Sequence, residues 1–218
     1  MQPFVFPRWA NKLVHLAGAV LGIAPLYIIG LVWYAASPKT TDVGYAPKQP
    51  VPYSHALHAG ELGLDCKYCH TTVDKAAHAA IPPTETCMNC HQRIHVQSPR
   101  LAPVRASAAT GEAIEWTKVH DLPDYAYFNH SMHVTQGIGC ASCHGRIDTM
   151  AVVYQHEPLS MGWCLDCHRA PENYLRPVNE VTNMAYEPPA GATQLDVGLK
   201  LRTENHINPP IDCSTCHR

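Results

Sequence analysis

The chain has 218 residues and a formal net charge of −2, so it offers no basic surface for a phosphate backbone, which argues against a nucleic-acid partner. Proline and histidine are abundant, at 19 and 15 residues, whereas phenylalanine and tryptophan number only 3 and 4. This composition argues against an ordinary core of aromatic and aliphatic side chains, and something other than side chains is expected to fill the interior.

The first predicted element is a membrane anchor over residues 1–36. Residues 16–36 are uncharged and would span about 30 Å as a helix, enough to cross a bilayer. Arg8 and Lys12 precede the run, and this positive flank predicts an N-terminus on the inner side. The run is longer than the apolar part of a signal peptide, roughly 7–15 residues. We therefore expect an uncleaved single-pass helix over residues 13–36 in the cytoplasmic (inner) membrane, with the remaining chain on the periplasmic side.

Residues 37–52 contain four prolines and are predicted to form an extended stalk. An internal repeat follows, in which an aromatic residue precedes two histidines spaced by three positions: His55 and His58 in residues 53–91, and His130 and His133 in residues 125–168. The linker 92–124 and the segment 169–212 show no steady periodicity. We expect both to be loops, apart from about one helical turn near residues 111–116.

The ten cysteines form five C-x-x-C pairs, each followed directly by histidine. C-x-x-C-H is the attachment signature of c-type haem, because two thiols on one side of a helical turn can form thioethers to the porphyrin while the histidine reaches the iron. Zinc sites or redox disulfides would not need that histidine, and five pairs cannot combine two by two into zinc sites. We therefore predict five covalent haem c groups, bound at Cys66, Cys69 and His70; Cys87, Cys90 and His91; Cys140, Cys143 and His144; Cys164, Cys167 and His168; and Cys213, Cys216 and His217.

The sixth iron ligand decides between an electron carrier and a site open to substrate. The two His-x-x-His pairs resemble those of multihaem class III cytochromes, in which the first histidine usually binds the haem that follows directly. The resemblance assigns His55 and His130 to the haems of the next motifs, and His58 and His133 to later haems, with His133 a candidate for the fifth. His120 is a candidate for a first-half haem, and Met161 and Met150 for a haem with one methionine ligand. We expect the remaining histidines of this region to face solvent: His78, His95, His156 and His206.

The expected fold is therefore a class III-like multihaem cytochrome c, mostly irregular, with short α-helices around the haems and one N-terminal transmembrane helix. The haem domain is assigned to residues 53–218, and residues 169–218 carry the wrapping segment and the fifth motif.

Three longer runs resemble one known family: residues 81–91 (IPPTETCMNCH), 116–133 (WTKVHDLPDYAYFNHSMH) and 159–169 (LSMGWCLDCHR) are similar to the pentahaem cytochrome c subunit of alternative complex III. The resemblance implies an electron relay from menaquinol. The implied partners are polytopic membrane subunits, an iron–sulfur (molybdopterin-like) subunit, and a downstream monohaem cytochrome c, cupredoxin or oxidase. In that family His55, His58, His120, His130, His133, Met150 and Met161 fall on shared motif positions.

Two other functions stay open at this point: a self-sufficient, membrane-anchored multihaem quinol dehydrogenase, and a multihaem catalytic reductase with an open iron. No cysteine is left for iron–sulfur clusters, and a single membrane helix cannot enclose a quinol pocket. No nucleophile–base constellation is evident either. We therefore expect an electron-transfer subunit that does not catalyse a reaction alone, with no catalytic residue assigned.

Overall fold

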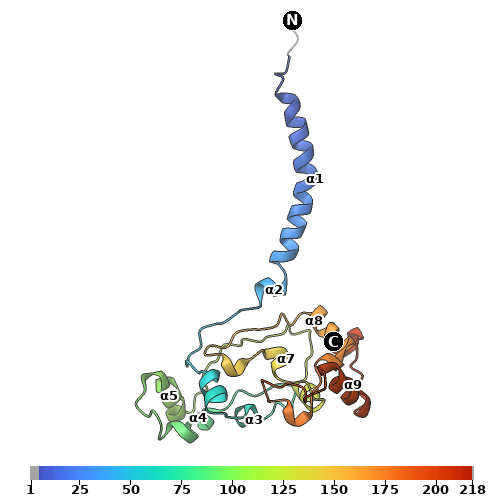
Figure 1. The fold of residues 1–218 in the computed structure, drawn as a ribbon. Coiled ribbons are helices and arrows are strands. Elements are labelled where there is room, and N and C mark those ends of the chain that lie inside the picture. The colour runs from blue at the N-terminus through green and yellow to red at the C-terminus, as the bar shows by residue number, and fades with distance from the viewer. Residues whose placement is uncertain (1–4, 218) are drawn as a thin grey trace. The chain divides into compact units, whose positions relative to one another are not determined.

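The computed structural model describes residues 5–217 (Figure 1). It divides after Asp42 into two units, one N-terminal and one covering the rest of the chain from Val43. Each unit is described by itself.

The N-terminal unit consists of one long helix and a short one. Helix α1 (Ala10–Ala35) contains Pro25, buries no side chain and is long and apolar enough to cross a membrane. It begins three residues before the predicted start at residue 13. Helix α2 (Pro38–Thr41) follows, because the hydroxyl of Ser37 accepts a hydrogen bond from the Lys39 amide and Pro38 occupies the first turn. The predicted stalk is thus helical at its start and not extended throughout.

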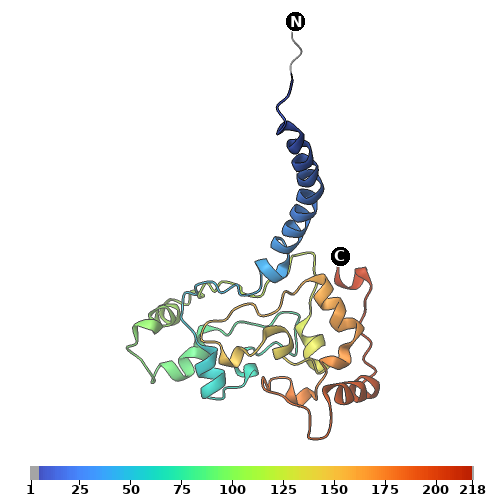
Figure 2. The same cartoon turned by 45° about the horizontal axis from the view of Figure 1, so that its top comes forward.

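The second unit consists of short helices joined by irregular segments (Figure 2). Between residues 43 and 217 there is no β-strand, and only two isolated bridges occur, Ala126 with His217 and Ile138 with Leu175. The expected fold class, with short helices around the motifs, is confirmed. The helices are η1 (Ala56–Glu61), α3 (Cys66–Cys69), α4 (Thr84–His91), η2 (Pro99–Leu101), α5 (Ala102–Thr110), α6 (His130–Thr135), α7 (Ala141–His144), η3 (Ile147–Thr149), α8 (Met161–Arg169), η4 (Pro171–Asn173), η5 (Val178–Glu180), α9 (Gln194–Glu204) and α10 (Cys213–Cys216).

The prediction for the linker was wrong. Helices η2 and α5 lie at residues 99–110, and α5 ends where Gly111 adopts a left-handed conformation with φ of 77°. The turn expected at residues 111–116 is therefore irregular, because the glycine that we placed inside the helix terminates it. Thr84 and Ser107 hydrogen-bond at 2.6 Å, so α5 packs on the helix of the second motif.

The prediction for residues 169–212 was also incomplete, because α9 lies within them. Its start carries a capping box: Thr193 accepts a hydrogen bond from the Asp196 amide, and the Asp196 carboxylate accepts one from the Thr193 amide. The helix packs on η4, where Arg202 forms an ion pair with Glu172 at 2.6 Å. Thr-x-x-Asp was the sequence signal that could have located this helix.

Side chains alone form only a small core. Most of the described residues of the second unit are partly or fully exposed. The buried apolar side chains are Val51, Val104, Val134, Met150, Leu175, Val181 and Met184. An ordinary domain of this size buries more apolar surface, so further apolar volume must come from a bound group.

Candidate haem sites

Each C-x-x-C-H motif lies on a helix or at its edge, and we number the sites first to fifth in chain order. The first, second, fourth and fifth motifs lie on α3, α4, α8 and α10, and the third begins at Cys140, directly before α7. The local sequence starts several of these helices: the side chains of Asp65, Ser160 and Asp212 accept hydrogen bonds from backbone amides in the first turn. The turn then presents both cysteines and the histidine near one another, as the spacing predicts.

No disulfide joins any of the ten cysteines. Among the described residues, no three His, Cys, Asp or Glu side chains gather in a way that could hold a metal ion. In each of the five pairs a histidine directly follows the second cysteine.

The two His-x-x-His repeats have the same local structure. Tyr53 lies with its ring centre 4.8 Å from that of His55 and 4.4 Å from that of His58. Phe128 repeats the arrangement at 4.7 Å from His130 and 4.5 Å from His133. One aromatic ring thus holds two imidazoles apart in each repeat. We assigned these two aromatic residues no role from the sequence, although their shared position two residues before the first histidine was the available signal.

Three of the repeat histidines lie opposite a motif histidine. The ring centres of His58 and His91 are 6.2 Å apart. Those of His130 and His144 are 6.4 Å apart with nearly parallel rings, and those of His133 and His168 are 6.1 Å apart. His133 therefore lies beside the fourth motif, a later motif than the one that follows it directly, and not beside the fifth, for which it was a candidate.

These separations fit one iron between each pair. Two imidazoles that bind a metal from opposite sides have ring centres about 6 Å apart, because each metal–nitrogen bond is about 2 Å and the nitrogen lies roughly 1 Å from the ring centre. Direct ring stacking would bring the centres closer. The second, third and fourth sites therefore have the spacing that two axial histidines require.

Hydrogen bonds fix the orientation of seven imidazoles. In each, Nδ1–H donates to a backbone carbonyl and leaves Nε2 free, which is the arrangement typical of metal-binding histidines. His78, His95 and His206 have no such bond within the described residues. The seven pairs are His58 with Ser54, His70 with Ala80, His91 with Ile94, His130 with Ala77, His133 with Asn129, His168 with Pro210, and His217 with Tyr125, at 2.6–3.1 Å.

Burial distinguishes the predicted iron ligands from the other histidines. The five motif histidines and the five predicted partners (His55, His58, His120, His130 and His133) are all partly buried. His78, His95, His156 and His206 are exposed, as expected. Burial, with smaller contributions from neighbouring imidazoles, lowers the pKa of His55 to about 4 and that of His144 to about 3. These rings are therefore neutral at pH 7, which is the form that binds a metal.

His120 lies at the third site. Its ring centre is 4.4 Å from that of His144, too close for an iron between the two rings. Its Nε2 is buried without a hydrogen-bond partner, and burial lowers the pKa of this imidazole to about 4. An unpartnered buried nitrogen is costly unless it binds something, so His120 also has the properties of a ligand.

The two candidate methionines differ in environment. The Met150 side chain packs in the small core, since the residue is only 5% exposed. Its backbone carbonyl accepts a hydrogen bond from the Ala56 amide. Met161 is 66% exposed at the start of α8, one turn before Cys164. Neither is held against a motif histidine by any contact found between residues 5 and 217.

A cavity of about 150 Å³ adjoins the third site. His120, His130, His133 and His144 line it together with Cys140, Cys143 and Cys164. The other walls are mainly apolar, as the porphyrin plane requires. The apolar residues are Val73, Leu122, Phe128, Val134, Ile138, Leu159 and Trp163. The donor set, its spacing and this lining fit a covalently held haem.

Comparison with known proteins agrees with this geometry. Residues 126–218 match the family described as cytochrome c7 and related cytochrome c. The chain is also 30% identical over 131 residues to the "menaquinone reductase, multiheme cytochrome c subunit" of Nitratidesulfovibrio vulgaris (strain Hildenborough), a match that covers 56% of this chain and 59% of that protein. The motifs, the ligand geometry and both similarities thus give this chain the fold class of a multihaem c-type cytochrome, with a cytochrome c7-like C-terminal part.

Proposed function

We propose that this chain is the pentahaem electron-relay subunit of a membrane quinol oxidoreductase of the alternative complex III type. It would pass electrons from menaquinol, by way of an iron–sulfur subunit, to a periplasmic carrier or oxidase. The observation that carries the proposal is the spacing of three histidine pairs, because ring centres 6.1–6.4 Å apart would close both sides of an iron held between them: His58 with His91, His130 with His144, and His133 with His168. A closed iron transfers electrons and does not bind substrate.

Covalently bound haem c would supply one-electron oxidation and reduction, and the residues of this chain hold and orient it. We assign His58 as the distal ligand opposite His91, His130 opposite His144, and His133 opposite His168. His55 is assigned to the first site on the likeness to class III histidine pairs, in which the first histidine binds the haem that follows directly, and its Nδ1 is buried without a hydrogen-bond partner. His120 is the remaining histidine candidate, and Met150 and Met161 stay as candidates for the fifth site.

The same proposal covers location and partners. Helix α1 would anchor the chain in the cytoplasmic membrane with its N-terminus inside, so that the haem domain lies on the periplasmic side. Polytopic membrane subunits and an iron–sulfur subunit would be permanent partners. The relative's name, which places it as a subunit of a menaquinone reductase, supports a complex of this kind.

The first test is extraction of the native membrane with mild detergent, followed by a native gel stained for haem and mass spectrometry of the stained band. We expect this chain in a large band with an iron–sulfur subunit and polytopic membrane proteins. A haem-stained chain that runs alone, and that still takes electrons from menaquinol, would replace the relay with the self-sufficient quinol dehydrogenase.

Phe128→Ala should loosen two ligands together, because the ring contacts both His130 and His133. Removing a packed aromatic ring costs about 3–5 kcal/mol, and here the loss falls on the turn that carries both imidazoles. We expect high-spin haem signals from two sites in electron paramagnetic resonance spectra. Tyr53→Phe keeps the ring of the other repeat and serves as the control, with unchanged low-spin spectra. A Phe128→Ala protein with all haems low-spin would exclude this positioning role.

Electron transfer to a basic soluble acceptor should slow as ionic strength rises. The chain has a formal charge of −2, and with about −1 for each ferric haem the holoprotein carries roughly −7 oxidised and −12 reduced. Stopped-flow rates between about 0.01 and 0.5 M salt should fall tenfold or more. Propionates paired with arginine would weaken this field, but Arg146 and Arg169 already contact Asp148 and Asp166. A rate independent of salt would contradict the expectation.

A further inference from the structure

The contacts among the five motifs follow an order that differs from their order in the sequence. Particular residues link each motif to one or two others, and these links place the five motifs in a spatial order. Rates of electron transfer fall steeply with the distance between redox centres, so the sequence of contacts indicates which sites can exchange electrons directly.

The second motif joins the first. The Asn89 side chain, inside the second C-x-x-C, donates to the Tyr68 hydroxyl inside the first, at 3.1 Å. The same turn carries His58, which lies opposite His91, and His55, which we assign to the first site. Between residues 5 and 217, no hydrogen bond or ring contact joins the second motif to the third, fourth or fifth.

The first motif joins the third. A bridging segment supports this junction: the Cys140 amide donates to the Val181 carbonyl at 2.9 Å, and the next residue, Thr182, donates to the Asp65 carboxylate at 3.0 Å. Asp65 directly precedes Cys66, so the first and third motifs are both hydrogen-bonded to the same backbone segment, residues 181–182.

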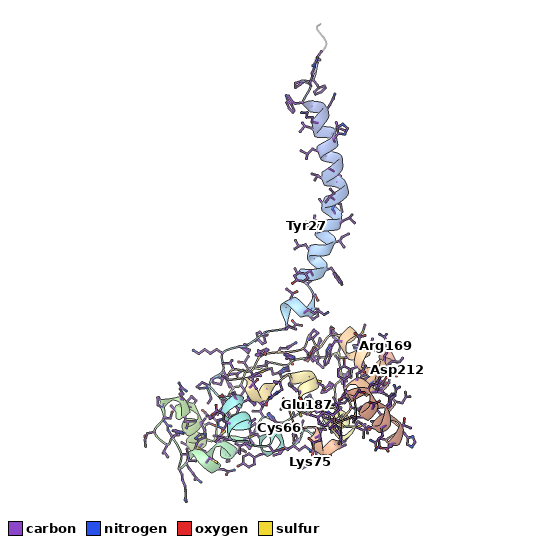
Figure 3. The ribbon with its side chains drawn as sticks, viewed as in Figure 1. Tyr27, Cys66, Lys75, Arg169, Glu187 and Asp212 are labelled. Atoms are coloured by element: carbon purple, nitrogen blue, oxygen red, sulfur yellow. The ribbon has the colours of Figure 1, made fainter. Side chains whose placement is uncertain are left out.

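The third motif joins the fourth, and the fourth joins the fifth. A single turn of α6 carries His130 opposite His144 and His133 opposite His168. His168 then donates through Nδ1 to the carbonyl of Pro210 at 2.6 Å, three residues before Cys213. In Figure 3 the labelled Arg169 and Asp212, which directly follow His168 and precede Cys213, lie at the same side of the unit.

The two ends of this series are also the most open sites. Cys90 of the second motif and Cys213 of the fifth are exposed, whereas the other eight motif cysteines are partly buried. Figures 1 and 2 agree with this order: α4 lies at one side of the second unit, α8 and the C-terminus lie at the other, and α7 lies between them.

We propose that the haem sites form one unbranched series in the order second, first, third, fourth, fifth, and that the second and fifth sites are the two places where partner proteins exchange electrons with this chain. The inference rests on the proposed relay function and adds the two sites at which electrons would enter and leave the chain. At the three interior sites, all six motif cysteines are partly buried.

The order can be tested on the purified holoprotein by NMR redox titration, in which the methyl signals of each haem report its own midpoint potential. A change of charge at one haem shifts the potentials of its neighbours most, because the interaction falls with distance and is screened by salt. His58→Met alters the second site and should shift the first haem, leaving the fourth and fifth unchanged. His78→Met, at an exposed histidine near the first site, is the control and should shift no haem.

A second variant tests the other end. Cys213→Ala combined with Cys216→Ala removes the fifth haem and should shift the fourth haem only, leaving the second and first unchanged. If either variant shifts a distant haem as much as the predicted neighbour, the series is wrong. This measurement needs no partner protein, so a wrong order is distinguishable from a wrong function, which the native-gel experiment decides.

Discussion

Cys140→Ala combined with Cys143→Ala should abolish accumulation of the folded protein. The third site is in the middle of the proposed series, and an apolar cavity of about 150 Å³ adjoins it. A cavity of that size left unfilled costs about 4 kcal/mol at roughly 24 cal/mol per Å³, before any loss of iron ligation is counted. Domains are stable by only about 5–15 kcal/mol, so the variant should be close to unfolded.

The matched control is the double cysteine variant of the fifth motif. Helix α10 buries no side chain, and Cys213 is exposed. Cys213→Ala with Cys216→Ala should therefore give a folded protein that carries four haems. The measurements are the haem-to-protein ratio from pyridine haemochrome spectra and the melting temperature from circular dichroism. A third-site variant that contains four haems and melts with the parent would show that this haem is not part of the core.

Gly198→Ala should cause the second large loss of stability. The backbone of α9 packs so closely on η4 that a Cβ at Gly198 would overlap the carbonyl oxygen of Glu172. The Cβ is fixed rigidly to the backbone of α9, and the oxygen belongs to the backbone of η4. Neither atom can rotate away, so the helix must shift. The shift would also weaken the Arg202–Glu172 ion pair and the hydrogen bond from Gln194 to the Leu175 carbonyl, each 2.6 Å. Overpacking of this kind costs about 3 kcal/mol, and we expect the melting temperature to fall by about 6–12 °C.

Lys200→Ala is the control in the same helix. Its side chain is 72% exposed and contacts only Glu204, at 3.9 Å, among the ion pairs of the described residues. Exposed pairs of this kind contribute about 0.2–1 kcal/mol, so the melting temperature should stay within about 4 °C of the parent. A Gly198→Ala protein with the melting temperature of the Lys200→Ala protein would mean that α9 can move away from η4 without cost.

The sequence predicts the haem-binding motifs because their chemistry is local. Two cysteines and a histidine within one helical turn come together whatever the rest of the chain does. The His-x-x-His repeats are readable for the same reason. Helices α5 and α9 were missed because neither has a clear apolar periodicity, and their boundaries depend on Gly111 and on the Thr193 capping box.

The orientation of the imidazoles depends on contacts that the sequence does not pair. His130 is oriented by the Ala77 carbonyl, 53 positions away, and His217 by the Tyr125 carbonyl, 92 positions away. These acceptors are ordinary backbone groups, so no residue type marks them. Only the folded chain shows which carbonyl orients which ring.

The sequence by itself therefore determined the two histidine repeats and the long apolar N-terminal segment, and predicted the kind of cofactor and its attachment residues, because each depends on residue type and spacing within one or a few helical turns. The tertiary structure decided that His133 lies opposite His168, that His120 shares the third site, and that the first motif contacts the second directly and is linked to the third through residues 181–182. These relations join residues far apart along the chain. Their distances are set by how irregular segments pack around the haem sites, and no local pattern records that packing.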